Sequence, residues 1–154
     1  MEFRTREAVL KIAAWQLGVV EMPSGSNRQK YGEAFGMNGQ PWCMMFVWWV
    51  FHEAGFNLYK TARCTELTNR YKQAGQWVTS GYKPGDIVMF DFSGRKSKTE
   101  HVGIVESVSK DGKTLTTIEG NTGSTSQANG GAVMRRTRSV SLVTGACRPG
   151  YNQV

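Results

Sequence analysis

The chain has 154 residues and fits one globular domain, and its 40% hydrophobic and 20% charged residues exclude wholesale disorder. No apolar run is long enough to cross a bilayer, and the N-terminus lacks the apolar region and cleavage site of a signal peptide. The net charge of +7 suits an anionic partner. The basic residues form two short clusters: Arg95, Lys96 and Lys98, and Arg135, Arg136 and Arg138. Neither cluster is interleaved with aromatic residues as in nucleic-acid sites, so we interpret each as a solvated face.

The first half of the chain predicts helices. Residues 5–17 carry apolar side chains at helical spacing, and further helices are predicted over residues 42–54 and 65–74. A glycine directly follows each of these segments and can end the helix. Residues 23–41 contain repeated Gly and Pro, which predicts a long structured loop.

The second half predicts strands, over residues 85–92, 101–108, 114–119, 132–137 and 140–144. Asp111 and Gly112 predict a hairpin between the second and third of these strands, and residues 120–131 predict a polar loop. Helices followed by antiparallel strands indicate a single α+β domain, with N-terminal helices packed on an antiparallel β-sheet.

The three cysteines, Cys43, Cys64 and Cys147, form no CxxC pair and no metal-binding spacing with the two histidines. We therefore expect no metal and no cofactor. Without a signal peptide, reduced thiols are expected at Cys64 and Cys147, and a disulfide between them is the alternative.

Cys43 stands in the first turn of a predicted apolar helix, directly after Pro41 and Trp42. Unpaired backbone N–H groups and the helix dipole lower a thiol pKa at that place and supply donors for an oxyanion. This position indicates a nucleophile, and the alternative is a buried structural cysteine.

A nucleophilic thiol needs a base, and the chain has two histidines. His52 lies nine residues after Cys43 on the same predicted helix, on its opposite face and about 13 Å along the axis, so we interpret it as a surface residue. His101 heads a predicted strand after a polar loop, where its side chain can project into a cleft. We expect His101 to be the general base.

The third member of the site follows from the hairpin. A loop over residues 109–113 places His101 opposite Asn121. Gly103 then lies opposite Glu119, and all four project from one face. Glu119 becomes a diagonal neighbour of His101, with room left by Gly103. We expect Glu119, or in second place Asn121, to accept a hydrogen bond from the imidazole and orient it. The alternative for Glu119 is a surface carboxylate.

The oxyanion hole is only partly defined by the sequence. The backbone N–H of Cys43 is one expected donor. Tyr31, Asn38 and Gln40 are all polar and close upstream, and the choice among them for the second donor stays open. Trp42 either lines the substrate groove or packs in the core.

Several segments together resemble one family: NRQKYGEAFGMNGQPWCMMFVWWVFHEAG, KPGDIVMFDF, HVGIVESV and TIEGNTG, with the closing AVMRRTRSV and VTGACRPGY. They look like the CHAP family of cysteine, histidine-dependent amidohydrolases/peptidases, in particular phage endolysins, over residues 8–151. The resemblance implies a papain-like α+β fold and one catalytic domain. It puts the nucleophile on Cys43, the base on His101 and the orienting carboxylate on Glu119, with Asn121 just behind it.

The resemblance further implies a peptidoglycan substrate, cut as an endopeptidase or as an N-acetylmuramoyl-L-alanine amidase. We expect a monomer that acts at the bacterial cell wall, released from the host cytoplasm if phage-encoded. Anionic wall polymers are further expected partners, and nucleic acid and membrane are not. Some relatives carry an Asp-rich calcium loop before the cysteine. Residues 23–42 contain no Asp, so no calcium is expected there.

Two other interpretations remain open. The NlpC/P60 family of wall peptidases is disfavoured because Trp-Cys-Met-Met and the Glu-x-Asn pair fit CHAP better. A non-catalytic wall-binding or adaptor domain is disfavoured because the cysteine, histidine and carboxylate are all present.

Overall fold

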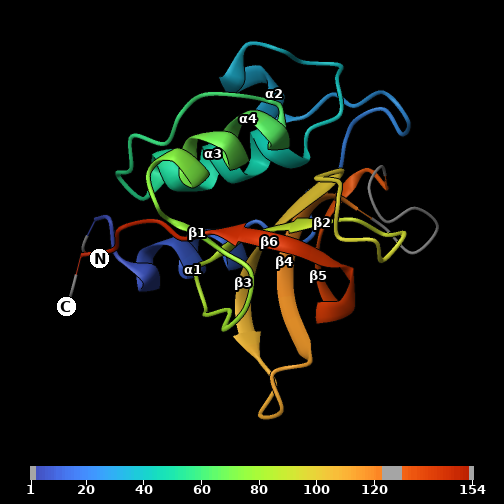
Figure 1. Cartoon of the computed structure of the whole chain (residues 1–154). Helices are drawn as coiled ribbons and strands as arrows, with labels where there is room; N and C mark the ends of the chain where they lie inside the picture. The colour runs from blue at the N-terminus through green and yellow to red at the C-terminus, as the bar shows by residue number, and fades with distance from the viewer. Residues whose placement is uncertain (1–2, 123–129, 153–154) are drawn as a thin grey trace.

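The computed structural model describes residues 3–122 and 130–152, which form four α-helices, a six-stranded antiparallel sheet and a short 3-10 turn. The helices are α1 Arg6–Trp15, α2 Lys30–Phe35, α3 Cys43–Glu53 and α4 Cys64–Gln73. The strands are β1 Trp77–Val78, β2 Ile87–Phe90, β3 His101–Val108, β4 Thr114–Thr122, β5 Ala132–Ser139 and β6 Val143–Cys147, with the turn η1 Val140–Leu142. The strand order is β1-β6-β2-β3-β4-β5, and α2, α3 and α4 lie together along one side of the sheet (Figure 1). The predicted α+β class is confirmed.

The three long helices lie within two residues of their predicted limits. The α1 helix begins at Arg6 because the hydroxyl of Thr5 caps it, accepting from the backbone N–H of Ala8 at 3.1 Å. The structure corrects the prediction of a continuous loop over residues 23–41, because α2 lies inside it. This helix has only six residues, with Tyr31 and Phe35 buried on one face, and this is too short for periodicity to predict it.

The strands occur where predicted, with differences at their ends. The two-residue strand β1 was not predicted, and β4 runs on to Thr122 rather than ending at residue 119. Residues 140–142 form η1 before β6 starts, instead of the beginning of a strand. Residues 123–129 of the predicted polar loop lie outside the described residues.

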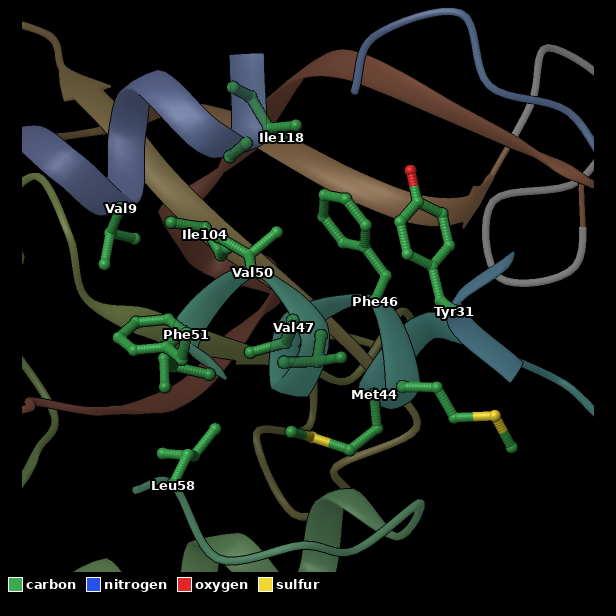
Figure 2. Close-up of a cluster of buried hydrophobic side chains, with 14 of the residues drawn as sticks. Val9, Tyr31, Met44, Phe46, Val47, Val50, Phe51, Leu58, Ile104 and Ile118 are labelled. Atoms are coloured by element: carbon green, nitrogen blue, oxygen red, sulfur yellow. The ribbon is translucent and has the colours of Figure 1, made fainter. Parts of the chain in front are cut away.

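The α3 helix is the centre of the larger core. Met44, Phe46, Val50 and other buried side chains cover it almost all round. Figure 2 shows several of them together with Ile104 and Ile118 of the sheet, Val9 of α1, Tyr31 of α2 and Leu58. The apolar sequence of this helix therefore reflects burial inside the protein. No helix within the described ranges is long and apolar enough to cross a membrane.

Phe51→Ala should lower the free energy of unfolding by about 3–5 kcal/mol, because it removes a fully buried ring and leaves a cavity. Glu53→Ala, at an exposed position of the same helix, should change this free energy by less than about 0.5 kcal/mol. Urea denaturation followed by circular dichroism measures both. Equal, small effects would contradict the central role of α3 in the core.

Candidate active site

The β3–β4 hairpin has the predicted register at its open end, although not at its turn. Near the turn, Val108 pairs with Leu115, one residue away from the predicted pairing. A bulge between Val105 and Ser107 then removes this offset, so that Ile104 pairs with Ile118 as predicted. The bulge thus restores the alignment that brings the beginning of β3 beside the end of β4.

This alignment brings His101 and Glu119 into direct contact. Nε2 of His101 lies 2.8 Å from Oε1 of Glu119, and both side chains are completely buried. Gly103 supplies the space, because a Cβ at that position would lie 2.8 Å from Cγ of Glu119. Asn121 is buried at the end of β4 with a φ of 55°, and its Oδ1 accepts from the backbone N–H of Gly131 at 3.1 Å.

The Glu119 carboxylate also accepts hydrogen bonds from two other side chains. The hydroxyl of Thr117 donates to Oε2 at 2.6 Å. Arg138 donates from Nε to Oε2 at 2.9 Å and from Nη2 to Oε1 at 2.5 Å. Burial alone would raise the pKa of Glu119, but hydrogen bonds and charge from Arg138 and His101 outweigh it and lower the pKa to about 2. Glu119 is therefore an anion at every physiological pH.

The interpretation of Arg135, Arg136 and Arg138 as one solvated face is wrong for Arg138. Its side chain is buried against the carboxylate of Glu119. Arg135 does face solvent, where it forms an ion pair with Glu106 at 2.7 Å. Successive residues of a strand point to opposite faces, so Arg135 and Arg138, three residues apart on β5, lie on opposite faces of the sheet.

Cys43 is the first residue of α3 and is partly exposed. The side chain of the N-cap residue Trp42 makes no capping hydrogen bond, so the first backbone N–H groups of the helix stay available near the thiol. A hydrogen bond from the Cys64 thiol lowers the pKa of Cys43 well below its ordinary value. Burial opposes this shift, and the hydrogen bond and positive charge of His101 reinforce it.

His101 lies between Cys43 and Glu119. Its Nδ1 has no oxygen or nitrogen partner among the described residues, while Nε2 is bound to Glu119. Burial disfavours the imidazolium, but the hydrogen bonds and charges of Cys43 and Glu119 outweigh it and raise the pKa of His101 to about 9. Nδ1 is therefore the nitrogen that can exchange a proton with Cys43.

Two of the candidate substrate-binding residues lie in the core instead. Tyr31 is completely buried and its hydroxyl donates to Oε1 of Gln16 at 3.0 Å, so it cannot serve as an oxyanion donor. Trp42 is also completely buried, stacks on Tyr31 and donates from its indole N–H to Glu21 at 3.2 Å. Of the two interpretations of Trp42, the packing role is therefore correct and the groove-lining role is wrong.

Asn38 and Gln40 are exposed in the segment that precedes Cys43. Oδ1 of Asn38 accepts from the backbone N–H of Gln29 at 3.1 Å, which leaves its amide N–H groups as donors. His52 is exposed and its ring stacks on Trp48, as expected for a surface residue of α3.

All three cysteine thiols are free. Cys147 is completely buried and its Sγ lies 4.0 Å from the backbone oxygen of Leu67. Within residues 3–122 and 130–152, no group of three or more His, Cys, Asp or Glu side chains could hold a metal ion.

Cys64 is a neighbour of Cys43 that the sequence did not predict. It is the first residue of α4, just as Cys43 is the first residue of α3, so the two helices begin beside each other. The pKa of Cys64 is raised well above its ordinary value, first by the contact with Cys43 and second by burial. Cys64 therefore stays protonated beside Cys43, where its S–H can donate to the Cys43 thiolate. The position of a cysteine at a second predicted helix start was the available signal.

Cys64→Ala should raise the pH at which Cys43 becomes reactive toward iodoacetamide, because the thiolate loses a donor. Cys64→Ser keeps a donor and should stay closer to the parent protein. The alkylation rate as a function of pH, assigned to Cys43 by peptide mass spectrometry, measures the difference. Superimposable curves for the parent and Cys64→Ala would contradict this role.

The model of the CHAP domain family matches residues 35–121, more than half of the chain and a range that includes Cys43, His101 and Glu119. A search of the curated proteins finds no significant match.

The fold is similar to the crystal structure of the wild-type endolysin LysIME-EF1, with a TM-score of 0.61 and 15% identity over 98% of this chain and 66% of that one. It is also similar to Ly7917 with the hydrolyzing product of MDP, with a TM-score of 0.52 and 23% identity over 94% and 63% of the two chains. The chain thus spans about two thirds of the length of these solved proteins. With a family match over more than half of its length, the chain belongs to the CHAP domain family.

Proposed function

We propose that this chain hydrolyses amide bonds of bacterial peptidoglycan, with Cys43 as the nucleophile, His101 as the general base and Glu119 as the residue that orients the base. The observation that carries the proposal is the buried His101–Glu119 pair beside a partly exposed thiol at a helix N-terminus. Membership of the CHAP family and the endolysin-like fold support peptidoglycan hydrolysis in general.

In the proposed reaction, Nδ1 of His101 takes the proton of the Cys43 thiol, and the thiolate attacks the carbonyl carbon of the amide. The carbonyl oxygen becomes an oxyanion, which backbone N–H groups at the start of α3 stabilise. His101 then gives its proton to the leaving amine, and the C–N bond breaks to leave a thioester on Cys43. Water, deprotonated by His101, hydrolyses the thioester and releases the carboxylic acid and the free thiol.

Glu119 acts through His101 in this scheme. A carboxylate bound to Nε2 keeps the opposite nitrogen facing the thiol and stabilises the imidazolium as it forms. We assign this role to Glu119 rather than Asn121, because the amide oxygen of Asn121 accepts from Gly131. For the second oxyanion donor, Asn38 and Gln40 remain the exposed candidates.

We also propose that residues 8–151 form one catalytic unit that acts as a monomer at the cell wall. The described residues share one continuous sheet, which supports a single unit. The net charge of +7 supports an additional attraction to anionic wall polymers. The paired imidazole and the lowered pKa of the Cys43 thiol argue against a purely adhesive role, since binding needs neither.

An endopeptidase and an N-acetylmuramoyl-L-alanine amidase would use the same catalytic groups and differ in the bond that they cut. Mass spectrometry of fragments released from purified walls separates them. An endopeptidase creates a new N-terminal amino acid within the peptide, whereas the amidase frees the lactyl carboxylate of the muramic acid.

Cys43→Ser should abolish lysis of purified walls while leaving the fold intact, because a serine hydroxyl is too weak an acid to be ionised by His101. Cys147→Ser is the matched control, since its thiol lies in the core, and it should keep most of the activity. Turbidity of a wall suspension measures lysis, and thermal unfolding checks the fold. Lysis by a folded Cys43→Ser protein at the parent rate would refute the nucleophile assignment.

Glu119→Gln should lose less activity than His101→Ala, because an amide can still orient the imidazole but nothing replaces the base. The pH profile of the rate gives a second test, because the direction of its shift can be predicted. Glu119 raises the pKa of His101 toward about 9, so its loss lowers that pKa and moves the alkaline limb of the rate to lower pH. An alkaline limb that stays in place in Glu119→Gln would show that Glu119 is not the partner of the base, and Asn121 would be tested next.

A further inference from the structure

Arg138 lies directly behind Glu119 and has only 3% of its surface exposed. Two of its hydrogen bonds reach the two oxygens of the carboxylate, at 2.9 and 2.5 Å. Such a bidentate pair fixes the plane of the carboxylate as well as its position, which a single hydrogen bond or a lysine cannot do. The guanidinium therefore determines which lone pair of Glu119 is presented to His101.

The aromatic rings of Phe90 and Phe92 pack against both the guanidinium of Arg138 and the imidazole of His101. The guanidinium carbon of Arg138 lies 5.2 Å from the centroid of Phe90 and 4.9 Å from that of Phe92. The imidazole of His101 lies against the same rings, with centroid distances of 6.1 and 5.9 Å. Arginine, carboxylate and imidazole therefore form one packed unit.

When the thiol is ionised, the charges of Cys43 and of this unit alternate: Cys43 is negative, His101 positive, Glu119 negative and Arg138 positive. Their sum is zero, which is the condition under which a set of buried charges is least costly. Without the arginine the set would carry a net negative charge away from water. It would reduce that charge by holding a proton more strongly on the thiol or the carboxylate.

We propose that Arg138 is a positioning residue of the hydrolytic reaction, which fixes Glu119 and through it the ring of His101. The inference rests on the proposed function, because it concerns the same thiol and base. Arg138 bonds to Glu119 rather than to the reacting thiol.

The titratable groups in and around the unit come from five elements and the loop after β2. His101 of β3 and Arg138 of β5 act on Glu119 of β4. Cys43 of α3 faces His101, and Cys64 of α4 faces Cys43. Asp91, which follows β2, is occupied by hydrogen bonds from its own loop: Ser93, Ser97 and Lys98.

The same strand provides a matched control. Arg135 also makes a bidentate pair with a glutamate, at 2.7 and 3.0 Å from Glu106, but on the solvent side and away from the thiol. Arg138→Met and Arg135→Met thus remove the same group from the same strand. Arg138→Lys keeps the charge and loses the planar fork.

The experiment measures the pH dependence of Cys43 alkylation by iodoacetamide and of wall lysis in these three variants, with thermal unfolding alongside. Arg138→Met should move the acid limb of both profiles to higher pH by about one unit or more, because the thiol and Glu119 then hold their protons more strongly. Arg138→Lys should keep the acid limb close to the parent and lower the maximal rate of lysis. Arg135→Met should leave both profiles in place.

An Arg138→Met protein with the parent acid limb would overturn the proposal, and so would Arg138→Lys with the parent maximal rate. If Arg138→Met does not fold, the lysine variant decides alone. Failure of the proposed function is recognised separately, by lysis that persists in Cys43→Ser, whereas the alkylation profile reports on Arg138 without any hydrolysis.

Discussion

The buried negative charge of Glu119 is the constraint on which the rest of the site depends. An ionised carboxylate with no access to water is costly unless donors fill its lone pairs. Here four hydrogen bonds do so, one each from His101 and Thr117 and two from Arg138. These donors come from β3, β4 and β5, so the charge is tolerated only while three strands keep their alignment.

The thiol depends on a different part of the fold, the starts of two helices. The apolar α3 helix is packed into the core along its length, which fixes its first residue, Cys43, over the beginning of β3. The α4 helix brings Cys64 to the same place, and its next residue, Thr65, hydrogen-bonds to Thr99 at 2.8 Å, two residues before His101. Helix packing therefore sets the distance between the Cys43 thiol and the imidazole of His101, whereas the sheet sets the orientation of that ring.

Much of this arrangement could be predicted from local patterns. Periodicity and glycines gave the three long helices, and the hairpin signal with its alternation gave the contact of His101 with Glu119. The agreement at the hairpin depends on the bulge between Val105 and Ser107, which compensates a one-residue error at the turn. A bulge has no reliable residue signature, so its position could not be predicted. A different bulge would have put Glu119 on the other face.

The parts that could not be predicted depend on contacts between distant segments. A strand arginine looks the same in sequence whether it faces solvent, as Arg135 does, or a buried carboxylate, as Arg138 does. Cys64 needed the packing of α4 beside α3, which no local pattern encodes. Tyr31 was misjudged for a different reason, since its polar hydroxyl suggested an oxyanion donor but is bound to Gln16 inside the core. For Trp42 the sequence left a groove-lining and a packing role open, and its indole N–H donates to Glu21 inside the core.

In the proposed reaction, the burial of this unit also separates proton transfer from substrate choice. His101 and Glu119 have no exposed surface and Arg138 almost none, so a substrate meets the unit at Cys43, which is partly exposed. If the proposed reaction is correct, changes in the surrounding loops would alter the choice of bond without disturbing the buried charges beside the thiol. Asn38 and Gln40 lie on such a loop and are exposed directly before Cys43. The structure thus keeps its buried charged groups in the sheet, apart from exposed loop residues whose replacement costs little stability.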